Sequence, residues 1–461
     1  MSDDRFFAGL TAALAAARAA TPGLHAWCAL RRTLDSCQAL LQGRDGNALD
    51  CYQDRTVSET TYSMQVYALQ EDGASMGMST ATVDPRRPLP AQIAAALAAA
   101  RLARNPPWPL PAPPAVPYPE VCTADPAIVA DPAGEQARLL ALLRREAAAL
   151  EGVRMNSAEA YVNRRSLAAR WSTGIAVAKS VSDVYVEVAV EPLPGPNRQE
   201  VNPFIEAVGV DGLELPVFLR RVAEEARALG KTELPRTTEQ AVVLVDAEAV
   251  TGLLHELSGQ FRAECEYEKR PCLLPGAEAA SGPVAPGGDR LTLALDPLLP
   301  AMAQSTAFTD EGLPAERAIM IEDGVVRRQL VSTRFGHYLG RPANGICGNL
   351  VVPAGTRSRE ELLASAPEVL EIITFSSLLV NPQTLSWSSE IKLGRLYRDG
   401  RPVALVKGGV VSGNLRDNLR DCTFSRDLVT RNFLARAWYP ARGYRGPGHL
   451  LIRAGVKIAG G

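Results

Sequence analysis

The sequence predicts an α+β protein of two domains, and three observations lead to this prediction. The chain has 461 residues, more than a typical single domain of roughly 100–200 residues. Helical and strand-like segments occur in separate blocks instead of a regular β-α-β alternation. A polar, proline-bearing segment over 231–239 divides these blocks. We therefore expect an N-terminal α+β domain over 1–235 and a mainly β C-terminal domain over 236–461.

The N-terminal half alternates helices with hairpins. Apolar residues at helical spacing predict helices over 5–20, 91–104, 135–151 and 216–229. Alternating segments around short polar turns predict hairpins of 62–70 with 76–83 and of 158–171 with 175–190. The many prolines of 105–119 leave that stretch short of hydrogen-bond donors, so it should be an extended surface connection.

Strands dominate the expected C-terminal half. Apolar segments predict strands over 241–245, 291–295, 317–321, 325–330, 370–375 and 403–411. The pairs Asp323-Gly324 and Asp399-Gly400 have the composition of hairpin turns. Short helices are expected over 332–339, 359–366 and 415–421. Ser358 and Glu361 have the spacing of a capping box at the start of the second of these helices.

Composition excludes several classes of partner. The formal net charge is -2, so no global basic surface attracts nucleic acid or an anionic membrane. The start Ser2-Asp3-Asp4-Arg5 is unlike a signal peptide, and no run of 18 uncharged apolar residues occurs. We expect a cytoplasmic protein. The eight cysteines form no C-x-x-C pair, so we expect reduced thiols.

The residues His255 and Glu256 form the one protease-like motif. They lie on a segment, 247–261, that is predicted to be helical because its apolar residues recur on one face, namely Val250, Leu253, Leu254, Leu257 and Phe261. His255 and Gln260 fall outside that face, so both should point to solvent, a groove or a partner.

This motif is degenerate as a metal site. An H-E-x-x-H peptidase needs two imidazoles one turn apart, but position 259 is glycine and position 260 is a glutamine. Glutamine is a weak, neutral ligand. The favoured interpretation is an exposed His-Glu pair without a metal, and the alternative is that Cys265 or Cys272 joins His255 as a ligand.

A second candidate site is the stretch Ser412-Gly413-Asn414. Its backbone amides could bind a substrate, yet a strand-to-helix turn with Asn414 as N-cap explains it equally well. No G-x-S-x-G and no P-loop lysine motif is present.

An ordered set of features connects the second half to a known family. The features are Asp310-Glu311-Gly312, Ile321-Glu322-Asp323-Gly324-Val325, Gly348-Asn349-Leu350, Val352-Pro353-Ala354-Gly355, Asn381-Pro382-Gln383-Thr384, Ser412-Gly413-Asn414-Leu415 and Lys457-Ile458-Ala459-Gly460. In this order they resemble the TldD/PmbA family, the "modulator of DNA gyrase" peptidases. The resemblance implies a two-domain α+β protein that dimerises. It also implies a cytoplasmic metallopeptidase of unfolded or modified peptides, including leader peptides.

Departures from the family pattern imply a role for this chain within a pair. The family's metal subunit carries H-E-x-x-x-H, and here Gln260 replaces the second histidine. No cysteine follows Cys422, although that subunit supplies one near its C-terminus. In the loop after Thr384, Leu385-Ser386 replaces the usual glycine and acid. The resemblance thus implies a TldE/PmbA-like subunit without a metal, and zinc or iron in a TldD-like partner.

Two alternatives remain open. The chain could be a self-sufficient enzyme of a specialised biosynthetic pathway that uses His255, Glu256 and an unidentified third ligand. It could also be a peptide-binding scaffold with no catalytic role. A homodimer is one assembly open to the chain alone, and neither nucleic acid nor a membrane is an expected partner.

Overall fold

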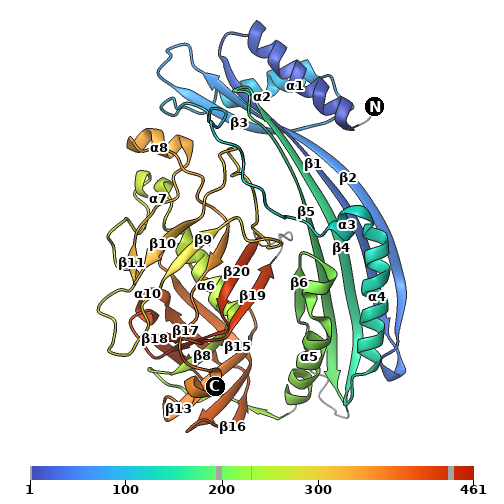
Figure 1. Cartoon of the computed structure of the whole chain (residues 1–461), viewed down its shortest axis with the longest axis vertical. Helices are drawn as coiled ribbons and strands as arrows, with labels where there is room; N and C mark the ends of the chain where they lie inside the picture. Colours follow the sequence, from blue (N-terminus) through green and yellow to red (C-terminus); the bar gives the residue numbers. More distant parts are fainter. Residues whose placement is uncertain (1–2, 194–199, 230, 434–440, 461) are drawn as a thin grey trace.

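The computed structural model describes residues 3–193, 200–229, 231–433 and 441–460. These residues form an α+β structure of three sheets, which confirms the predicted fold class. One long, curved sheet forms one side of the molecule, and two shorter sheets with a helix between them form the other (Figure 1). No helix of the described ranges is long and apolar enough to span a membrane.

The first sheet has six strands in the order β3-β2-β1-β4-β5-β6, all antiparallel. The strands are β1 (Leu24–Gly43), β2 (Leu49–Leu69), β3 (Met76–Val83), β4 (Val153–Trp171), β5 (Ala176–Pro192) and β6 (Phe204–Ala207). Both expected hairpins are present as β2-β3 and β4-β5. The sequence did not predict β1 or the first half of β2.

Five helices cover one face of this sheet. Their bounds are α1 (Asp3–Ala20), α2 (Leu89–Ala100), α3 (Pro126–Ala130), α4 (Pro132–Ala148) and α5 (Leu215–Leu229). The helices α1 and α2 form one core with the start of β1 and the second half of β2. The helices α4 and α5 form another core with the end of β1 and with β4 and β5. Strand side chains alternate between faces, so Ala29 and Ala39 pack beneath helices while Arg32 lies on the opposite face.

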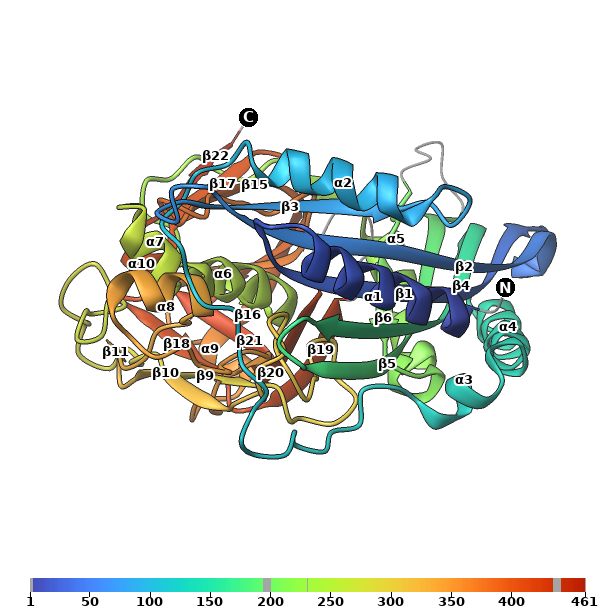
Figure 2. The ribbon, with the colours of Figure 1, turned by 90° about the horizontal axis from the view of Figure 1, so that it is seen from above.

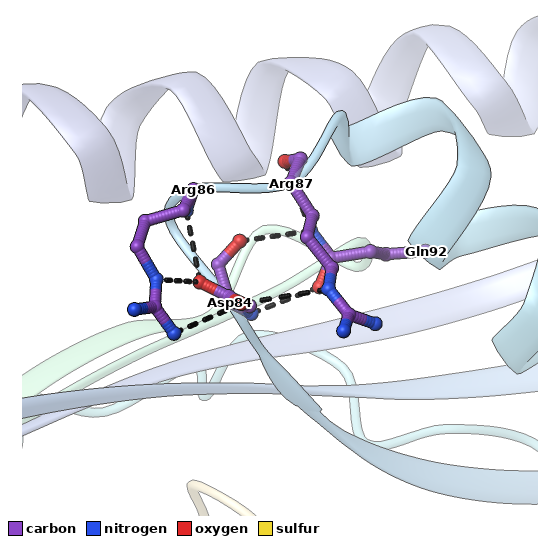
Figure 3. Close-up of polar contacts among 4 residues, drawn as sticks. All are labelled: Asp84, Arg86, Arg87 and Gln92. Atoms are coloured by element: carbon purple, nitrogen blue, oxygen red, sulfur yellow. Dashed lines mark hydrogen bonds and ion pairs between the residues drawn. The ribbon is translucent and has the colours of Figure 1, made fainter.

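The turn that ends β3 is held by its own side chains (Figure 3). The Asp84 carboxylate accepts a hydrogen bond from the Arg86 amide at 2.9 Å and one from Arg86 Nε at 3.1 Å. Gln92 on α2 accepts from the Asp84 amide at 2.8 Å and donates to the Arg87 carbonyl at 3.1 Å. This network turns the chain away from the sheet directly after Val83.

The C-terminal half contains two sheets. One has the order β11-β10-β9-β12-β20-β19, and the other has β18-β21-β8-β13-β15-β16-β7 with β14, β17 and β22 attached. The strands are β7 (Thr232–Glu233), β8 (Val243–Asp246), β9 (Leu293–Asp296), β10 (Ala318–Glu322), β11 (Val325–Val326), β12 (Asn349–Val351), β13 (Glu368–Phe375), β14 (Leu379–Val380), β15 (Ser386–Arg398), β16 (Arg401–Val406), β17 (Val410–Asn414), β18 (Cys422–Phe424), β19 (Leu428–Phe433), β20 (Arg442–Pro447), β21 (His449–Ile452) and β22 (Val456–Ala459).

Two expected strands of this half need correction. The segment 325–330 contributes only the two residues of β11. The segment 403–411 is divided between β16 and β17, because Gly408 and Gly409 both have positive φ, 84° and 68°, and break the strand. The two expected hairpin turns are correct, since Asp323-Gly324 and Asp399-Gly400 both adopt positive φ.

The remaining helices are α6 (Ala247–Gly259), α7 (Ala263–Tyr267), α8 (Thr333–Leu339), α9 (Arg359–Leu363) and α10 (Leu415–Asn418). The predicted capping box of Ser358 and Glu361 is present at the start of α9. Between the halves, β7 pairs with β16. The start of the polar segment 231–239 is therefore hydrogen-bonded to the C-terminal sheet, so this segment is not an unpaired linker.

The proline-rich segment 105–119 is extended, as predicted, but it also joins the two halves. Trp108 is 7% exposed and packs edge-on against Tyr67 and Tyr338. The Arg334 guanidinium lies 4.6 Å from the centre of the Trp108 ring, and Tyr338 donates to the Pro106 carbonyl at 2.6 Å. Figure 2 shows the segment running beside α8 and on toward α3. The segment thus straps the N-terminal sheet to α8.

Candidate functional site

The helix α6 carries the degenerate motif and lies at the centre of the C-terminal core. Asp246 caps its N-terminus by accepting a hydrogen bond from the Ala249 amide at 3.1 Å. Its predicted apolar residues Val250, Leu253, Leu254, Leu257 and Phe261 are all buried, each at most 2% exposed. This face packs among residues of both C-terminal sheets. The core therefore fixes the direction of the polar face that carries His255 and Glu256.

A guanidinium group lies beside the motif. Arg442, the first residue of β20, donates from Nη2 to Glu256 Oε1 at 3.2 Å. Both side chains are largely buried, with exposed fractions of 19% and 24%. The Glu256 carboxylate, which would serve as the base in a metallopeptidase, is thus held in an ion pair.

The imidazole of His255 is held neutral. Burial, together with the smaller effect of the positive charges of Arg442 and Arg262, lowers the pKa of His255 from its ordinary 6.5 to about 4. No described residue forms a hydrogen bond to the His255 ring. A second-shell acceptor, which usually orients a metal-ligating histidine, is therefore not provided by the described part of the chain.

The expectation that Gln260 points to solvent, a groove or a partner is wrong. Gln260 is 5% exposed, and its Nε2 donates to the carbonyls of Pro382 at 3.1 Å and Gln383 at 2.8 Å. Gln260 is the C-cap that follows α6 and keeps helical backbone angles, φ -79° and ψ -4°, so it is buried because another part of the chain covers that flank of the helix. The loop after β14 packs against this end of α6 and receives the amide.

The loop that Gln260 holds is itself ordered by side chains. Asn381 Oδ1 accepts from the amides of Gln383 and Thr384 at 2.9 and 3.0 Å. Leu385, which is fully buried, adopts a φ of 58°. The departure from the family pattern at Leu385 therefore lies in a loop that is packed against the motif helix.

These residues do not fit a metal ion. Nε2 of Gln260 points at carbonyl oxygens, and the Arg442 guanidinium places a positive charge next to the carboxylate and near the imidazole. Cys265 donates instead to the Gly259 carbonyl at 3.6 Å. Within the described ranges, no three side chains of His, Cys, Asp or Glu come close enough to share a metal. His255 therefore has no such set with Cys265 or Cys272.

The second candidate stretch, Ser412-Gly413-Asn414, forms the end of β17. This strand pairs with β15 on one side and β22 on the other. Asn414 Oδ1 accepts from the Arg416 amide at 3.0 Å as the N-cap of α10, and its Nδ2 donates to the Thr384 carbonyl at 2.8 Å. The arrangement corresponds to the strand-to-helix turn, one of the two interpretations of the sequence.

The residue beside the motif that the sequence analysis missed is Arg442. It lies 186 positions beyond Glu256, and no local pattern distinguishes it from the other arginines. Only the pairing of β20 between β12 and β19 brings it beside α6. No signal in a single sequence could have found it.

Comparisons with known proteins agree with this architecture. Residues 238–460 match the family model of the PmbA/TldA metallopeptidase C-terminal domain. A metalloprotease of Archaeoglobus fulgidus is 24% identical over 232 residues, which are 48% of this chain and 52% of that protein. The metalloprotease PmbA of Escherichia coli O157:H7 is 27% identical over 200 residues, 42% of this chain and 43% of that protein. The chain thus matches about half the length of these curated relatives.

Solved structures cover the whole chain. A Bacteroides thetaiotaomicron protein described as a modulator of DNA gyrase matches with a TM-score of 0.79 and 17% identity, over 100% of this chain and 99% of that one. TldE of Thermococcus kodakarensis matches with a TM-score of 0.74 and 14% identity, over 99% of both chains. At this identity the structures establish the fold alone. The second half of this chain, residues 238–460, is thus similar to the C-terminal domain of the PmbA/TldA metallopeptidases, and the whole chain shares the fold of these solved structures.

Proposed function

We propose that this chain is the metal-free subunit of a two-subunit metallopeptidase of the TldD/TldE type. One observation carries the proposal: the position of a second metal ligand is taken by Gln260, whose amide is bonded to two backbone carbonyls. The ion pair of Glu256 with Arg442 supports it as well. In this view α6 keeps the shape of a catalytic helix but has a structural role.

The metal would be zinc or iron held by a TldD-like partner, and this chain would close the chamber around the substrate. The substrate class is an unfolded or modified peptide, such as a leader peptide, in the cytoplasm. An extended peptide bound beside a sheet edge would be held by main-chain hydrogen bonds with little dependence on its sequence.

The test is to purify the chain alone and together with a TldD-like subunit from the same host. We expect no stoichiometric zinc or iron in the lone chain, no cleavage of an unfolded test peptide, and cleavage when both subunits are present. Stoichiometric metal together with cleavage by the lone chain would refute the proposal and favour the self-sufficient enzyme.

The scaffold alternative gives a different result in the same assay. If the partner alone cleaves the peptide at the full rate, this chain contributes no catalytic function. A variant in which the partner's metal ligands are removed serves as the control, because it should abolish cleavage by the pair without changing the amount of complex.

A further inference from the structure

The face of the first sheet that the helices leave uncovered contains a cavity of about 320 Å³. The cavity lies over β1, β2, β4 and β5. Its lining includes three basic side chains, those of Arg32, Arg165 and Lys179, and one acidic side chain, that of Glu59. Sites for small ligands in proteins begin at about 300 Å³. The cavity is therefore large enough for a small ligand or for a short piece of a peptide.

The strand register places the basic side chains on one face of the sheet. Arg32 pairs with Leu167, and Leu167 pairs with Lys179. Directly opposite residues of antiparallel strands share a face, so Arg32 and Lys179 flank Leu167 on the same side. Neighbouring strands lie about 4.8 Å apart, which separates the Cα atoms of Arg32 and Lys179 by roughly 10 Å. Two long side chains at this separation can contact one small anion placed over Leu167.

The third basic residue, Arg165, already has a counter-ion. Its guanidinium forms an ion pair with Asp183, which is 4% exposed. The other carboxylate oxygen of Asp183 accepts a hydrogen bond from Asn163 Nδ2 at 2.6 Å. The Asp183 carboxylate is thus held by Arg165 and Asn163, and it does not neutralise Arg32 or Lys179.

Arg32 and Lys179 form no ion pair with any residue in the described ranges. Arg32 Nη1 donates to Ser63 Oγ at 3.4 Å, and Lys179 Nζ donates to Thr306 Oγ1 at 3.2 Å. The Lys179 ammonium also lies 5.5 Å from the centre of the Phe308 ring. Two residues of the C-terminal half therefore hold this ammonium at the cavity. Two cationic groups without a paired carboxylate on the wall of one cavity attract an anion.

Lys179 is the less exposed of these two basic residues. Burial lowers the pKa of Lys179, and the negative charge of the nearby Asp310 opposes this effect only in part. A partly buried ammonium group without a paired carboxylate is unfavourable. A bound anion would therefore stabilise the charged form of Lys179.

We propose that this cavity binds a carboxylate group of an extended peptide between Arg32 and Lys179. The peptide nature of the ligand rests on the proposed function, and the site would add a preference for carboxylates to main-chain binding. A guanidinium group can hold a carboxylate through two parallel hydrogen bonds, and an ammonium group adds a compact charge. Leu167 and Val181, which also line the cavity, offer apolar contacts to the carbon chain beside the carboxylate.

Glu59 limits where the carboxylate can lie. It is directly opposite Leu34, two residues after Arg32 on β1, and so shares the face of the basic residues. Glu59 is on β2, whereas Lys179 is on β5, with β1 and β4 between them. Since like charges repel, the carboxylate should bind over Leu167, away from β2. Neutralising Glu59 should then strengthen the binding of an anion.

Isothermal titration calorimetry on the full-length chain alone tests the site with three acetylated peptides of equal length. The first has two glutamates and an amidated C-terminus, the second has glutamines in their place, and the third is the glutamine peptide with a free C-terminus. We expect the first or the third to bind at least about tenfold more tightly than the second. A gain for the first identifies a side-chain carboxylate as the ligand, and a gain for the third alone identifies the C-terminal carboxylate. No gain for either, or no binding at all, would overturn the inference.

Charge-neutralising variants locate the site. Arg32→Gln and Lys179→Gln should each weaken binding of the carboxylate peptide about tenfold and leave the amidated glutamine peptide unchanged. Glu59→Gln should strengthen it. Arg32 is exposed, so its variant should keep the parent's Tm even if Lys179→Gln does not. The matched control is Arg170→Gln, an exposed position of β4 that alternation places on the opposite face, and it should change nothing.

Two results with these variants would contradict a site in the cavity. One is an equal loss in Arg170→Gln, which would show a general effect of net charge. The other is unchanged binding in both Arg32→Gln and Lys179→Gln. Because these measurements use the chain alone and no cleavage, their failure would leave the two-subunit proposal standing. In the same way, absence of cleavage by the pair would not affect the binding result.

Discussion

Arg442 donates a hydrogen bond to Glu256 at 3.2 Å, although it lies 186 positions after Glu256 in the sequence. The contact places a permanent positive charge directly beside the degenerate His-Glu motif. Since a guanidinium group stays protonated at every ordinary pH, this charge does not depend on the solvent conditions. Removing it should have measurable electrostatic consequences at His255.

The first prediction concerns that histidine. In Arg442→Ala the pKa of His255 should rise from about 4, because a nearby positive charge is lost. It should remain below the ordinary 6.5, because burial is the larger cause. Titration of the histidine ring signals by NMR measures the change. The variant Arg445→Ala, at an exposed position on the same strand, is the control and should leave the titration unchanged.

Restoring the missing histidine should not restore a metal site. In Gln260→His, the Arg442 guanidinium still repels a cation and the new side chain faces the carbonyls of the 382–383 loop. We expect no stoichiometric zinc by atomic absorption after exposure to excess metal. The double variant Gln260→His/Arg442→Ala should bind zinc more tightly than either single variant. Stoichiometric zinc in Gln260→His alone would contradict this account.

Gln260 should matter for stability. Gln260→Ala removes the buried Gln260 amide and its two hydrogen bonds to the carbonyls of Pro382 and Gln383, so we expect the free energy of unfolding to fall by about 2 kcal/mol. Chemical denaturation monitored by circular dichroism measures the loss. The matched control is Gln383→Ala in the same loop, whose side chain is exposed and which should change stability by less than about 0.5 kcal/mol. Equal effects of the two variants would argue against a structural role for Gln260.

Stability should fall as the pH decreases from 7 to 4. The pKa of His255 is about 4 in the folded chain, against an ordinary 6.5. Between these values the unfolded chain binds more protons, so protonation favours unfolding. The contribution of His255 is at most about 3 kcal/mol, given ~1.4 kcal/mol per pKa unit. Urea denaturation across this range should show a shallower pH dependence in His255→Gln, and an unchanged dependence would refute the assignment.

The proline-rich segment 105–119 should be held less firmly when its buried tryptophan is removed. Trp108→Ala removes a buried ring that contacts Tyr67, Tyr338 and Arg334, at a cost of about 3 kcal/mol. Limited proteolysis should then cut within 105–119 faster than in the parent chain. The variant Leu102→Ala is the control, because that side chain is 86% exposed nearby. Equal rates in the parent chain and Trp108→Ala would show that the aromatic contacts do not hold this segment.

Most helices and the hairpins could be predicted from the sequence because one face of each is buried. The α6 face of Val250, Leu253 and Leu257 is such a case. β1 was missed because its middle, around Arg31, Arg32 and Asp35, has polar residues on both faces. The alternation of apolar and polar residues, which identifies a half-buried strand, is therefore absent there. The exposed first half of β2 lacks the same signal.

The candidate site could be predicted only where its residues are close in sequence. His255, Glu256 and Gln260 were identified because they share one helix, and their mutual spacing is readable. The environment of Gln260 depends on the loop at Pro382 and Gln383, and that of Glu256 depends on Arg442. These contacts arise from sheet pairing and loop packing between distant segments, which spacing along one helix does not encode.

The contacts of the proline-rich segment 105–119 affect which fragments of the chain would keep their packing. The region that matches the family model begins at residue 238, far beyond Trp108 and Tyr118. A fragment of that region alone would leave Tyr338 and Arg334 without the tryptophan that covers them, and the Gly312 carbonyl without the Tyr118 hydroxyl that bonds to it at 2.8 Å. The unit of sequence similarity is therefore smaller than the unit that buries these contacts.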